Sequence, residues 1–502
     1  MIRKIYLIVL LSCFFITSQA ANGDSIFNPW TIHTLRITYP YSTFYDSLLN
    51  TNTTDQYLMV SVDFNSEHYD SIGIQAKGNS SFSGPGQKKS FKLDINEFVN
   101  GQDIHGLKKL NFNNSFKDPT MMREKIVNDF LRAHGLPAPR TTYCNVYMNG
   151  QLWGLYTIVE AIDDEFCKRW FSNKDGNLFQ GDPRGDLAWK GSSTQSLYEP
   201  NYDLENNSTA NDWSDLIELI NIINNTPTAT LNTALEAKLN SSNFIKQWAT
   251  INLFSSLDSY IGSGHNYYIY HDTITDKFEW IGWDNNEAFG NFKNGLTASQ
   301  LLNLDMYYIS TPTNSRPLCN NMLLNTTYKN AYNQAYCELL DDFSISYFEP
   351  KIDSLYDLIK SSVYADPKKT TTNAQFETNI DTTVFMSGPG GLDAFGLKSF
   401  IRGRRTSALA SLNSHSVVCT NAIEEELASS HLQIMPNPTN SWVQIAFDHA
   451  YSGDITLYDA IGNVMNNYKI YKEYEYSIDL SNLSNGFYFL KCGDSCYKLI
   501  KI

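Results

Sequence analysis

Segments with a strand pattern come first in this chain and segments with a helix pattern follow, and this order limits the possible folds more than any other feature. The early segments alternate apolar and polar side chains and are rich in β-forming residues, over residues 57–64, 72–76 and 91–95. Apolar side chains recur at helical spacing later, over residues 120–134, 320–365 and 395–412. The sequence therefore predicts an α+β fold with a sheet-rich first part and a helix-rich second part. Clusters of Thr, Gly and Pro predict a loop over residues 366–394.

Two hairpins are expected within this pattern. Asn149-Gly150, between β-forming residues 143–148 and 152–159, is the strongest short hairpin signal. A second hairpin is expected between residues 267–270 and 278–283. Pairing Tyr270 with Lys277 places Asn266 opposite Ile281 and Gly264 opposite Trp283.

The second hairpin brings polar side chains together at its open end. It returns Asp284 to the neighbourhood of Asp258 and Asn266. Two carboxylates and an amide oxygen suit Mg²⁺ (or Mn²⁺), which binds through few carboxylates plus substrate phosphates. The layout suits a phosphotransferase in which one Asp orients or deprotonates the acceptor hydroxyl, the second Asp holds the metal, and Asn266 completes the metal shell. The alternative is that Asp258 caps a turn and Asp284 ends a strand.

A second polar cluster covers residues 77–92. Its Gly and Ser residues, including Ser80, allow backbone amides to approach phosphates, while Lys77, Lys89 and Lys92 supply positive charge. By itself such a loop is more often a solvated hairpin. The Asp pair downstream makes a phosphate-binding loop a plausible hypothesis.

The net charge and the N-terminus limit the partners and the location. The formal net charge is −15, which disfavours nucleic acid as a partner. Residues 1–20 have a basic start, an apolar run and a small-x-small end, which predict a secretory signal peptide; the alternative is an N-terminal membrane anchor or a core helix. No stable transmembrane span is expected in the rest of the chain. The pairing of the eight cysteines is left open.

The C-terminal residues 427–502 read as a separate small all-β sandwich of six or seven strands. They contain Met435-Pro-Asn-Pro-Thr, Ile455-Thr-Leu-Tyr-Asp-Ala-Ile-Gly and Leu480-Ser-Asn-Leu-Ser-Asn-Gly-Phe-Tyr, and end in Lys498-Leu-Ile-Lys-Ile. This series resembles the type A sorting domain of the type IX secretion system of Bacteroidetes. The resemblance implies handling by the type IX secretion machinery and a secreted or outer-surface location. The alternative is an ordinary β-sandwich binding module.

Residues 35–410 resemble the CotH family of atypical protein kinases. The resemblance rests on Lys77-Gly-Asn-Ser-Ser, Lys88-Lys-Ser-Phe-Lys, Asp118-Pro-Thr-Met-Met-Arg-Glu, Gly135-Leu-Pro-Ala-Pro-Arg, Asn149-Gly-Gln-Leu-Trp-Gly-Leu-Tyr and the segments around Asp258 and Trp283-Asp284. It implies an atypical two-lobed protein-kinase-like domain over residues 21–426. It also implies the use of ATP and a divalent metal to phosphorylate Ser or Thr of an envelope or extracellular protein.

The same resemblance implies residue roles. Asp258 is the catalytic Asp and Asp284 the metal Asp. A lysine of residues 88–92 contacts phosphate, Lys89 being favoured over Lys92. Glu160 lies near the nucleotide or hinge, or else is only a strand-end carboxylate. The family usually has Arg where this chain has Lys77, which loses bidentate geometry toward phosphate.

Two other functions remain open at this point. A catalytically inactive, kinase-like surface scaffold or binding protein would have the same fold. A carbohydrate-active enzyme also uses paired carboxylates, although the Gly and Lys cluster disfavours it.

Overall fold

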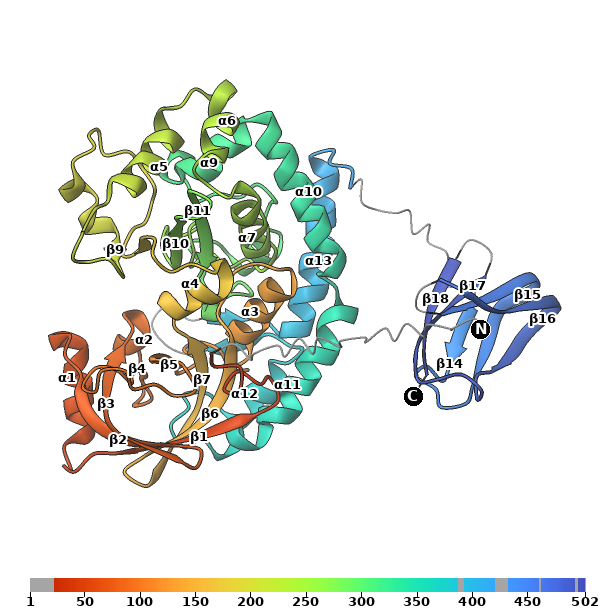
Figure 1. Cartoon of the computed structure of the whole chain (residues 1–502), viewed down its shortest axis with the longest axis horizontal. Helices are drawn as coiled ribbons and strands as arrows, with labels where there is room; N and C mark the ends of the chain where they lie inside the picture. The colour runs from red at the N-terminus through yellow and green to blue at the C-terminus, as the bar shows by residue number, and fades with distance from the viewer. Residues whose placement is uncertain (1–21, 387–391, 420–431, 460–461, 493–494, 502) are drawn as a thin grey trace, which may run out of the picture. The chain divides into compact units, whose positions relative to one another are not determined.

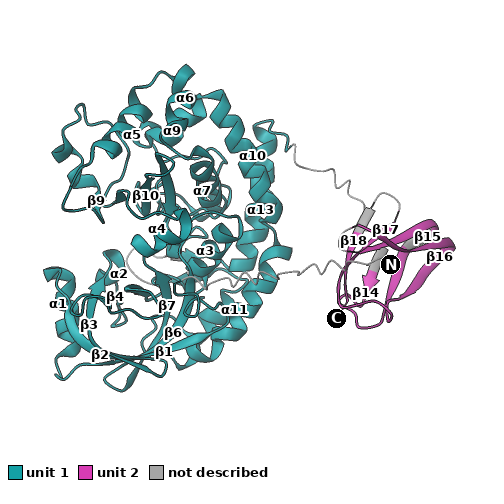
Figure 2. Ribbon diagram, viewed as in Figure 1, with its two compact units in different colours: residues 1–419 teal, residues 420–502 magenta. Residues whose placement is uncertain are grey.

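The computed structural model describes residues 22–386, 392–419, 432–459, 462–492 and 495–501. The chain divides into two compact units, residues 1–419 and 420–502 (Figure 2). The predicted signal peptide (1–20) and the predicted domain boundary at 426/427 both lie outside the described residues. Among the described residues, no helix has the length and apolar character needed to cross a membrane.

The first unit begins with a closed β-barrel (Figure 1), whose strand order is β1-β2-β3-β4-β5-β7-β6. Its strands are β1 (Ile32–Thr38), β2 (Leu58–Phe64), β3 (Glu67–Lys77), β4 (Ser90–Asp94), β5 (Lys109–Asn113), β6 (Thr141–Met148) and β7 (Gln151–Glu160). The parallel pairing of β1 with β6 closes the barrel, and the remaining neighbours pair antiparallel. Alternating apolar side chains fill the interior, so the barrel has its own core.

The β6–β7 hairpin confirms the prediction from Asn149-Gly150. Asn149 and Gly150 have φ angles of 46° and 80°. Both values are positive, as the tight two-residue hairpin turn requires. The Asn149 side chain also accepts a hydrogen bond from the backbone N–H of Tyr39 (2.9 Å), which joins the turn to the end of β1.

The predicted helix over residues 120–134 is also confirmed, as α3 (Arg123–Ala133). Gly135 follows it with a φ of 70°. Arg123 is fully buried and binds Asp118, Asn379 and the Phe395 carbonyl, so it is structural. Three further short helices near the barrel are α1 (Phe44–Thr54), the single turn α2 (Ser80–Ser83) and α4 (Asp164–Phe171), which Asp163 caps.

A four-stranded sheet follows the barrel, with the order β11-β10-β8-β9. Its strands are β8 (Leu178–Gln180), β9 (Asp203–Leu204), β10 (Tyr267–Asp272) and β11 (Lys277–Gly282). The predicted register of the β10–β11 hairpin is wrong by two residues, because Tyr270 pairs with Glu279 and Asp272 pairs with Lys277. Asp272 extends the strand, since its carboxylate accepts hydrogen bonds from Ile274 N–H (3.1 Å) and Thr275 Oγ1 (2.9 Å) and so builds the turn. An even shift leaves each side chain on its predicted face.

Helices make up most of the rest of the first unit. They are α5 (Ser214–Asn225), α6 (Leu231–Glu236), α7 (Ser241–Leu253), α8 (Ala298–Leu302), α9 (Pro317–Leu324), α10 (Thr326–Asp342), α11 (Ile345–Ala365), α12 (Asn373–Thr378) and α13 (Leu397–Ser414). One large apolar core joins α3, α7, α10, α11 and α13 with the second sheet. Helix α11 runs back beside the barrel and packs against β7 (Figure 1). The fold is α+β, as predicted.

The prediction of a loop over residues 366–394 is wrong in part. This stretch contains α12 and two short paired strands, β12 (Val384–Met386) and β13 (Leu392–Ala394). Thr372 and Gln375 form a capping box that starts α12, a signal present in the sequence but hidden among neighbouring threonines.

A disulfide joins Cys337 in α10 to Cys419. The two cysteines are 82 residues apart, and the sequence left their pairing open. The disulfide therefore fixes the segment after α13 to a helix of the buried core.

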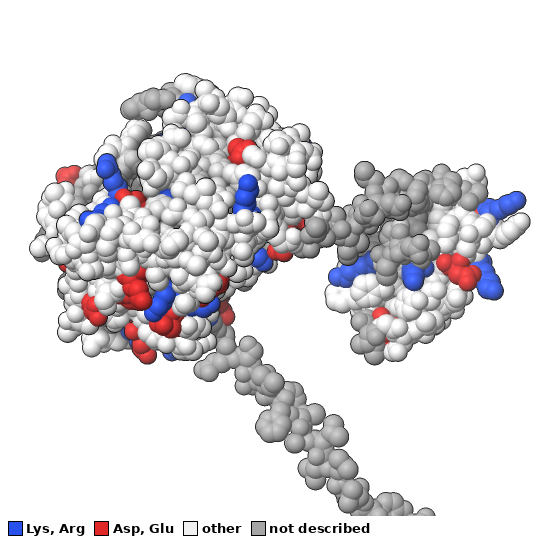
Figure 3. All heavy atoms as spheres, turned by 90° about the horizontal axis from the view of Figure 1, so that it is seen from above, with Lys and Arg blue, Asp and Glu red and all other residues white. Residues whose placement is uncertain are grey.

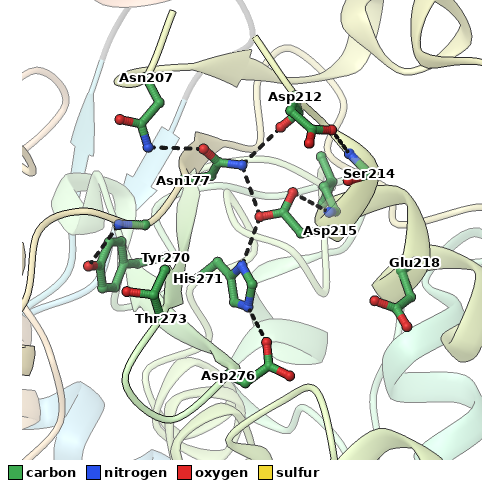
Figure 4. Close-up of polar contacts among 12 residues, drawn as sticks. Asn177, Asn207, Asp212, Ser214, Asp215, Glu218, Tyr270, His271, Thr273 and Asp276 are labelled. Carbon is green, nitrogen blue, oxygen red and sulfur yellow. Dashed lines mark hydrogen bonds and ion pairs between the residues drawn. The ribbon is translucent and has the colours of Figure 1, made fainter. Parts of the chain in front are cut away.

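A polar cluster around His271 holds the start of α5 against β10 (Figure 4). The imidazole Nδ1 lies 2.9 Å from Asp215 Oδ2, and Nε2 lies 3.0 Å from Asp276 Oδ1. Asn177 Nδ2 also donates to Asp215 Oδ2 (2.9 Å). The hydrogen bond to Asp215 is the main cause that raises the pKa of His271 above its ordinary value, although burial opposes it.

This raised pKa predicts a pH-dependent stability. Because folding raises the pKa of His271, its protonation stabilises the fold fully at pH values below the ordinary pKa of 6.5. This stabilisation is lost as the pH rises through the pKa of the folded state. We expect His271→Gln to cost about 1.5 kcal/mol of unfolding free energy at about pH 6 and clearly less at about pH 9. Chemical denaturation of both proteins at the two pH values measures this. An equal loss at both values would contradict a charged His271.

The second unit is all-β, as predicted, with a core of alternating apolar side chains. Its strands are β14 (Leu432–Met435), β15 (Trp442–Asp459), β16 (Val464–Asp479), β17 (Gly486–Cys492) and β18 (Ser495–Lys501). The described residues thus form five strands, whereas six or seven were predicted. The difference arises because β15 and β16 are long and continue through irregularities in register, the largest after Ala446, where shorter strands were expected.

Candidate functional site

Five of the predicted site residues line one cavity of about 280 Å³, called here the hairpin cavity. It lies at the open end of the β10–β11 hairpin, opposite the end of β3. The five are Lys77, Ser80, Asp258, Asn266 and Asp284. Gly78, Asn79 and Ser81 of the loop that follows β3 also line it. The structure therefore brings the hairpin residues and the glycine–serine loop (residues 78–88) to one place.

Asp284 stands out among these residues because its carboxylate is buried without a hydrogen-bond partner from the described residues. It follows β11 with a φ of 55°, and it makes no hydrogen bond or ion pair to any residue in the described part of the chain. Burial raises the pKa of Asp284 to about 6, the nearby Lys77 lowers it, and Asp258 raises it further. A buried carboxylate of this kind is stabilised by a cation.

Asn266 has its amide fixed by the backbone. Asn266 has a φ of 61°. Its side-chain Nδ2 donates to the backbone carbonyl of Asp258 (2.9 Å), and its backbone carbonyl accepts from the N–H of Trp283 (3.2 Å). This orientation leaves Oδ1 as the acceptor atom available to the cavity. The hairpin thus aligns Asn266 with Asp258 and places Asp284 one residue beyond Trp283.

Asp258 contacts a histidine that the sequence reasoning did not single out. His265 Nε2 lies 2.8 Å from Asp258 Oδ1, and Nδ1 lies 3.5 Å from Asp182 Oδ1. Burial lowers the pKa of His265, but the hydrogen bonds to Asp182 and Asp258 outweigh it and raise the pKa to about 9. The imidazolium holds one oxygen of Asp258 and leaves the other for a ligand. The sequence signal that could have identified His265 is its position directly before Asn266.

Lys77 ends β3 and extends between the cavity and the barrel. Its Nζ donates to Asn111 Oδ1 (3.1 Å) and lies 5.2 Å from the centre of the Trp283 ring. Burial lowers the pKa of Lys77, and the carboxylates of Asp284 and Glu124 oppose this change. The lysine is therefore a cation that faces the buried carboxylates of Asp284 and Glu124.

Two further carboxylates belong to this environment and were missed. Glu124 of α3 accepts hydrogen bonds from Asn113 Nδ2 (3.0 and 2.9 Å), and burial with Asp284 nearby raises its pKa to about 7. Glu287 lines the hairpin cavity and accepts from Lys117 Nζ (3.0 and 2.9 Å). Burial raises the pKa of Glu287 to about 7 as well, against the effect of Lys117. Only tertiary packing brings Glu124 and Lys117 here.

A second, larger cavity of about 640 Å³ adjoins the hairpin cavity. Lys77, Gln180 and Trp283 line both cavities, and Lys92 lines the larger one. Residues 161–163, which connect β7 to α4, and the first two residues of α4 form another part of its wall. Its volume is in the range of small-molecule sites.

Lys89 and Glu160 lie away from both cavities. Lys89 Nζ donates to the Gly84 carbonyl (2.7 Å), within the glycine–serine loop. The buried carboxylate of Glu160 binds Arg140 Nη2 (2.6 Å) and Arg169 Nη2 (2.6 Å). These contacts give Glu160 a structural role at the end of β7.

Replacement of Glu160 tests this structural role. Glu160→Gln leaves the guanidinium of Arg169 without its anion and leaves the buried Arg140 with Asp24 as its remaining anion, so we expect a loss of about 3 kcal/mol of stability. Affinity for nucleotide should stay within about twofold of wild type, since Glu160 lines neither cavity. Thermal unfolding and nucleotide titration measure the two effects. A large loss of affinity in a folded variant would place Glu160 in the nucleotide site instead.

The protein supplies only part of the ligand set that a hard cation needs. Among the described residues, no group of three or more His, Cys, Asp or Glu side chains is arranged to hold a metal ion. Asp284, without a partner, and Asn266 Oδ1 are oxygen donors in one cavity. This set fits Mg²⁺, which needs one or two carboxylates and takes its other ligands from water and phosphate.

The surface charge on the visible face does not indicate a particular class of partner. On the face shown in Figure 3, basic and acidic side chains are scattered and mixed, with no broad basic area.

Comparison with known proteins connects both units to families. Residues 433–501 match the secretion system C-terminal sorting domain, which indicates export by type IX secretion to the cell surface or outside. Residues 74–384 match the family described as CotH kinase protein. Inner spore coat protein H of Bacillus subtilis (strain 168) is 26% identical over 302 residues, which cover 59% of this chain and 79% of that protein.

The matched segment contains every residue that lines the hairpin cavity. Because the match covers more than half of the chain, the protein belongs to the CotH kinase protein family.

Proposed function

We propose that this protein is a secreted protein kinase that transfers the γ-phosphoryl group of ATP to Ser or Thr of an envelope or extracellular protein. One observation carries the proposal. Asp258, Asn266, Asp284 and Lys77 line the same cavity, next to a second cavity large enough for a nucleotide. Membership of the CotH kinase family, which implies ATP use, supports it.

The residues take the following roles in this proposal. Asp258, oriented by His265, accepts the proton of the acceptor hydroxyl. A bond forms between the acceptor oxygen and the γ-phosphorus, the bond to the β–γ bridging oxygen breaks, and ADP leaves. Lys77 and the amides of the loop at Ser80 bind phosphate oxygens.

Asp284 and Asn266 would hold Mg²⁺ (or Mn²⁺), which would neutralise charge on the phosphates. Lys92 faces the larger cavity and would bind the nucleotide from there. Lys89 would act through the loop, since it bonds the Gly84 carbonyl. In this proposal the barrel and the helix-rich part would form the two lobes of a kinase-like fold, and the nucleotide would bind between them.

The export route completes the proposal. A signal peptide over residues 1–20 would direct the chain across the inner membrane of a Bacteroidetes cell. The sorting domain over residues 427–502 would then take it through the type IX machinery to the outer surface. The domain over residues 21–426 would be the catalytic part.

Thermal unfolding of the full chain, with and without ATP and Mg²⁺, tests the function. Ligand at a hundredfold excess over its Kd adds about 2.7 kcal/mol of stability. A shift that requires both ATP and metal, together with transfer of γ-labelled phosphate to a Ser- and Thr-rich protein, would support a kinase. No shift at millimolar ATP would favour an inactive surface scaffold.

A further inference from the structure

A buried aspartate connects the helix-rich part of the first unit to the glycine–serine loop. Asp366 directly follows α11, and its side chain has no exposed surface. Its Oδ2 accepts from Lys88 Nζ (2.7 Å) and from the backbone N–H of Leu155 (3.0 Å). Its Oδ1 accepts from the backbone N–H groups of Lys368 and Lys369 (2.9 Å each). Asp366 is thus fully hydrogen-bonded between three segments.

The barrel has a glycine where Asp366 enters. Gly154 of β7 has a φ of 148°, and a Cβ added there would lie 2.4 Å from Asp366 Oδ1. A residue with a side chain would therefore displace the carboxylate. The close approach of the Asp366 carboxylate to the Gly154 backbone indicates that this side chain must occupy this position.

The segment that begins at Asp366 also contacts the loop itself. Lys368 Nζ donates to Gln87 Oε1 (2.5 Å). A Cβ added at Gly86 would lie 2.8 Å from Thr370 Cγ2, so Thr370 packs against the loop backbone. The C-terminal half of the loop is therefore held from the helix-rich part, while its N-terminal half lines the hairpin cavity.

Hydrogen bonds continue from Lys88 into the cavity wall. Asn114 Nδ2 donates to the Lys88 carbonyl (2.8 Å). Ser90 Oγ donates to Asn114 Oδ1 (3.1 Å), and Asn114 N–H donates back to Ser90 Oγ (3.0 Å). Asn114 and Ser90 both line the hairpin cavity. The position of Lys88 therefore sets two groups of the cavity wall.

We propose that Asp366 is a positioning residue for the phosphate-binding loop. Through Lys88 it fixes the glycine–serine loop and the adjoining residues 89–90 in the arrangement that binds phosphate. Nucleotide affinity therefore depends on a carboxylate that lines neither cavity. A buried ion pair contributes little net stability, and its best-attested use is to specify one arrangement. This inference rests on the proposed function for its effect on nucleotide, but not for its effect on the loop.

Hydrogen exchange on the full chain tests the effect on the loop without any ligand. We expect Asp366→Asn to increase amide exchange in residues 78–90 by about tenfold, because the Asn amide no longer holds the Lys88 ammonium. Glu160→Gln is the matched control, since it breaks a buried ion pair at the same barrel without touching the loop. Unchanged exchange in residues 78–90 of Asp366→Asn would overturn the proposal.

Nucleotide kinetics test the consequence. For Asp366→Asn we expect the KM for ATP to rise about tenfold with kcat changed by less than about threefold, whereas Glu160→Gln leaves KM unchanged. If Asp366→Asn does not fold, Lys88→Gln removes the same ion pair from the loop side and leaves Asp366 its three backbone N–H donors, and it should raise both loop exchange and KM. An unchanged loop in that variant would also overturn the proposal. A wild-type protein that binds no ATP, with loop exchange still raised in Asp366→Asn, would remove the proposed function and keep the positioning role.

Discussion

Asp258→Asn is expected to lower phosphoryl transfer to a protein acceptor by about 10²–10⁴-fold, because an amide cannot accept the proton of the attacking hydroxyl. The substitution keeps the shape of the side chain, and Asn266 bonds the Asp258 backbone, so the metal side of the cavity should persist. Nucleotide affinity should therefore stay within about threefold of wild type. Transfer of labelled phosphate and calorimetric titration of ATP with Mg²⁺ measure the two quantities.

The control for Asp258 is a second aspartate that pairs with a histidine. Asp305 Oδ2 lies 2.7 Å from His415 Nε2, and Asp305 lines neither the hairpin cavity nor the adjoining one. Asp305→Asn should leave the transfer rate unchanged. Equal rates in Asp258→Asn and wild type would show that Asp258 is not the base, whatever its position in the cavity.

Asp284→Asn is expected to weaken metal-dependent ATP binding by at least about a hundredfold, or about 2.8 kcal/mol. The variant keeps the volume of the side chain but loses the charge that would hold the cation. With the metal chelated, wild type and variant should bind ATP equally. Persistence of the metal effect on ATP affinity in Asp284→Asn would refute the assigned metal role.

The same variant should unfold at a higher temperature than wild type in the absence of ligand. Burial holds the pKa of Asp284 at about 6, above the ordinary 3.8, so its ionised form destabilises the fold at neutral pH. The sign follows from linkage. When folding raises the pKa of a carboxyl group, the protein loses stability as the pH rises above the ordinary pKa of that group. Removal of the charge removes this cost. A gain in stability together with a loss of ligand binding is typical of a functional site.

The hairpin argument predicted that Asp258, Asn266 and Asp284 lie together, because it depends on short-range geometry. A hairpin whose strands are adjacent in sequence must return Asp284 to Asn266, and the two-residue error in register did not change the faces. The turn at Asp272 could not be placed, because it depends on side-chain hydrogen bonds that have no strong sequence signal.

The long-range partners could not be predicted in this way. Glu160 was expected either near the nucleotide or hinge or as a strand-end carboxylate, and its contact with Arg169 depends on how α4 packs. Lys88 and Asp366 are 278 residues apart, and nothing in either segment points to the other. Neighbouring lysines look alike in sequence, so only the barrel geometry distinguishes Lys92, which lies in β4 and lines a cavity, from Lys89.

The disulfide between α10 and Cys419 has a mechanical consequence for a protein held through its C-terminal unit. Cys419 lies at the end of the first unit, so a pull on the second unit reaches the first unit at this residue. The covalent bond passes the load to α10, whose side chains belong to the large apolar core. Under such a load helix α13 would be shielded from tension, and the core would bear the force.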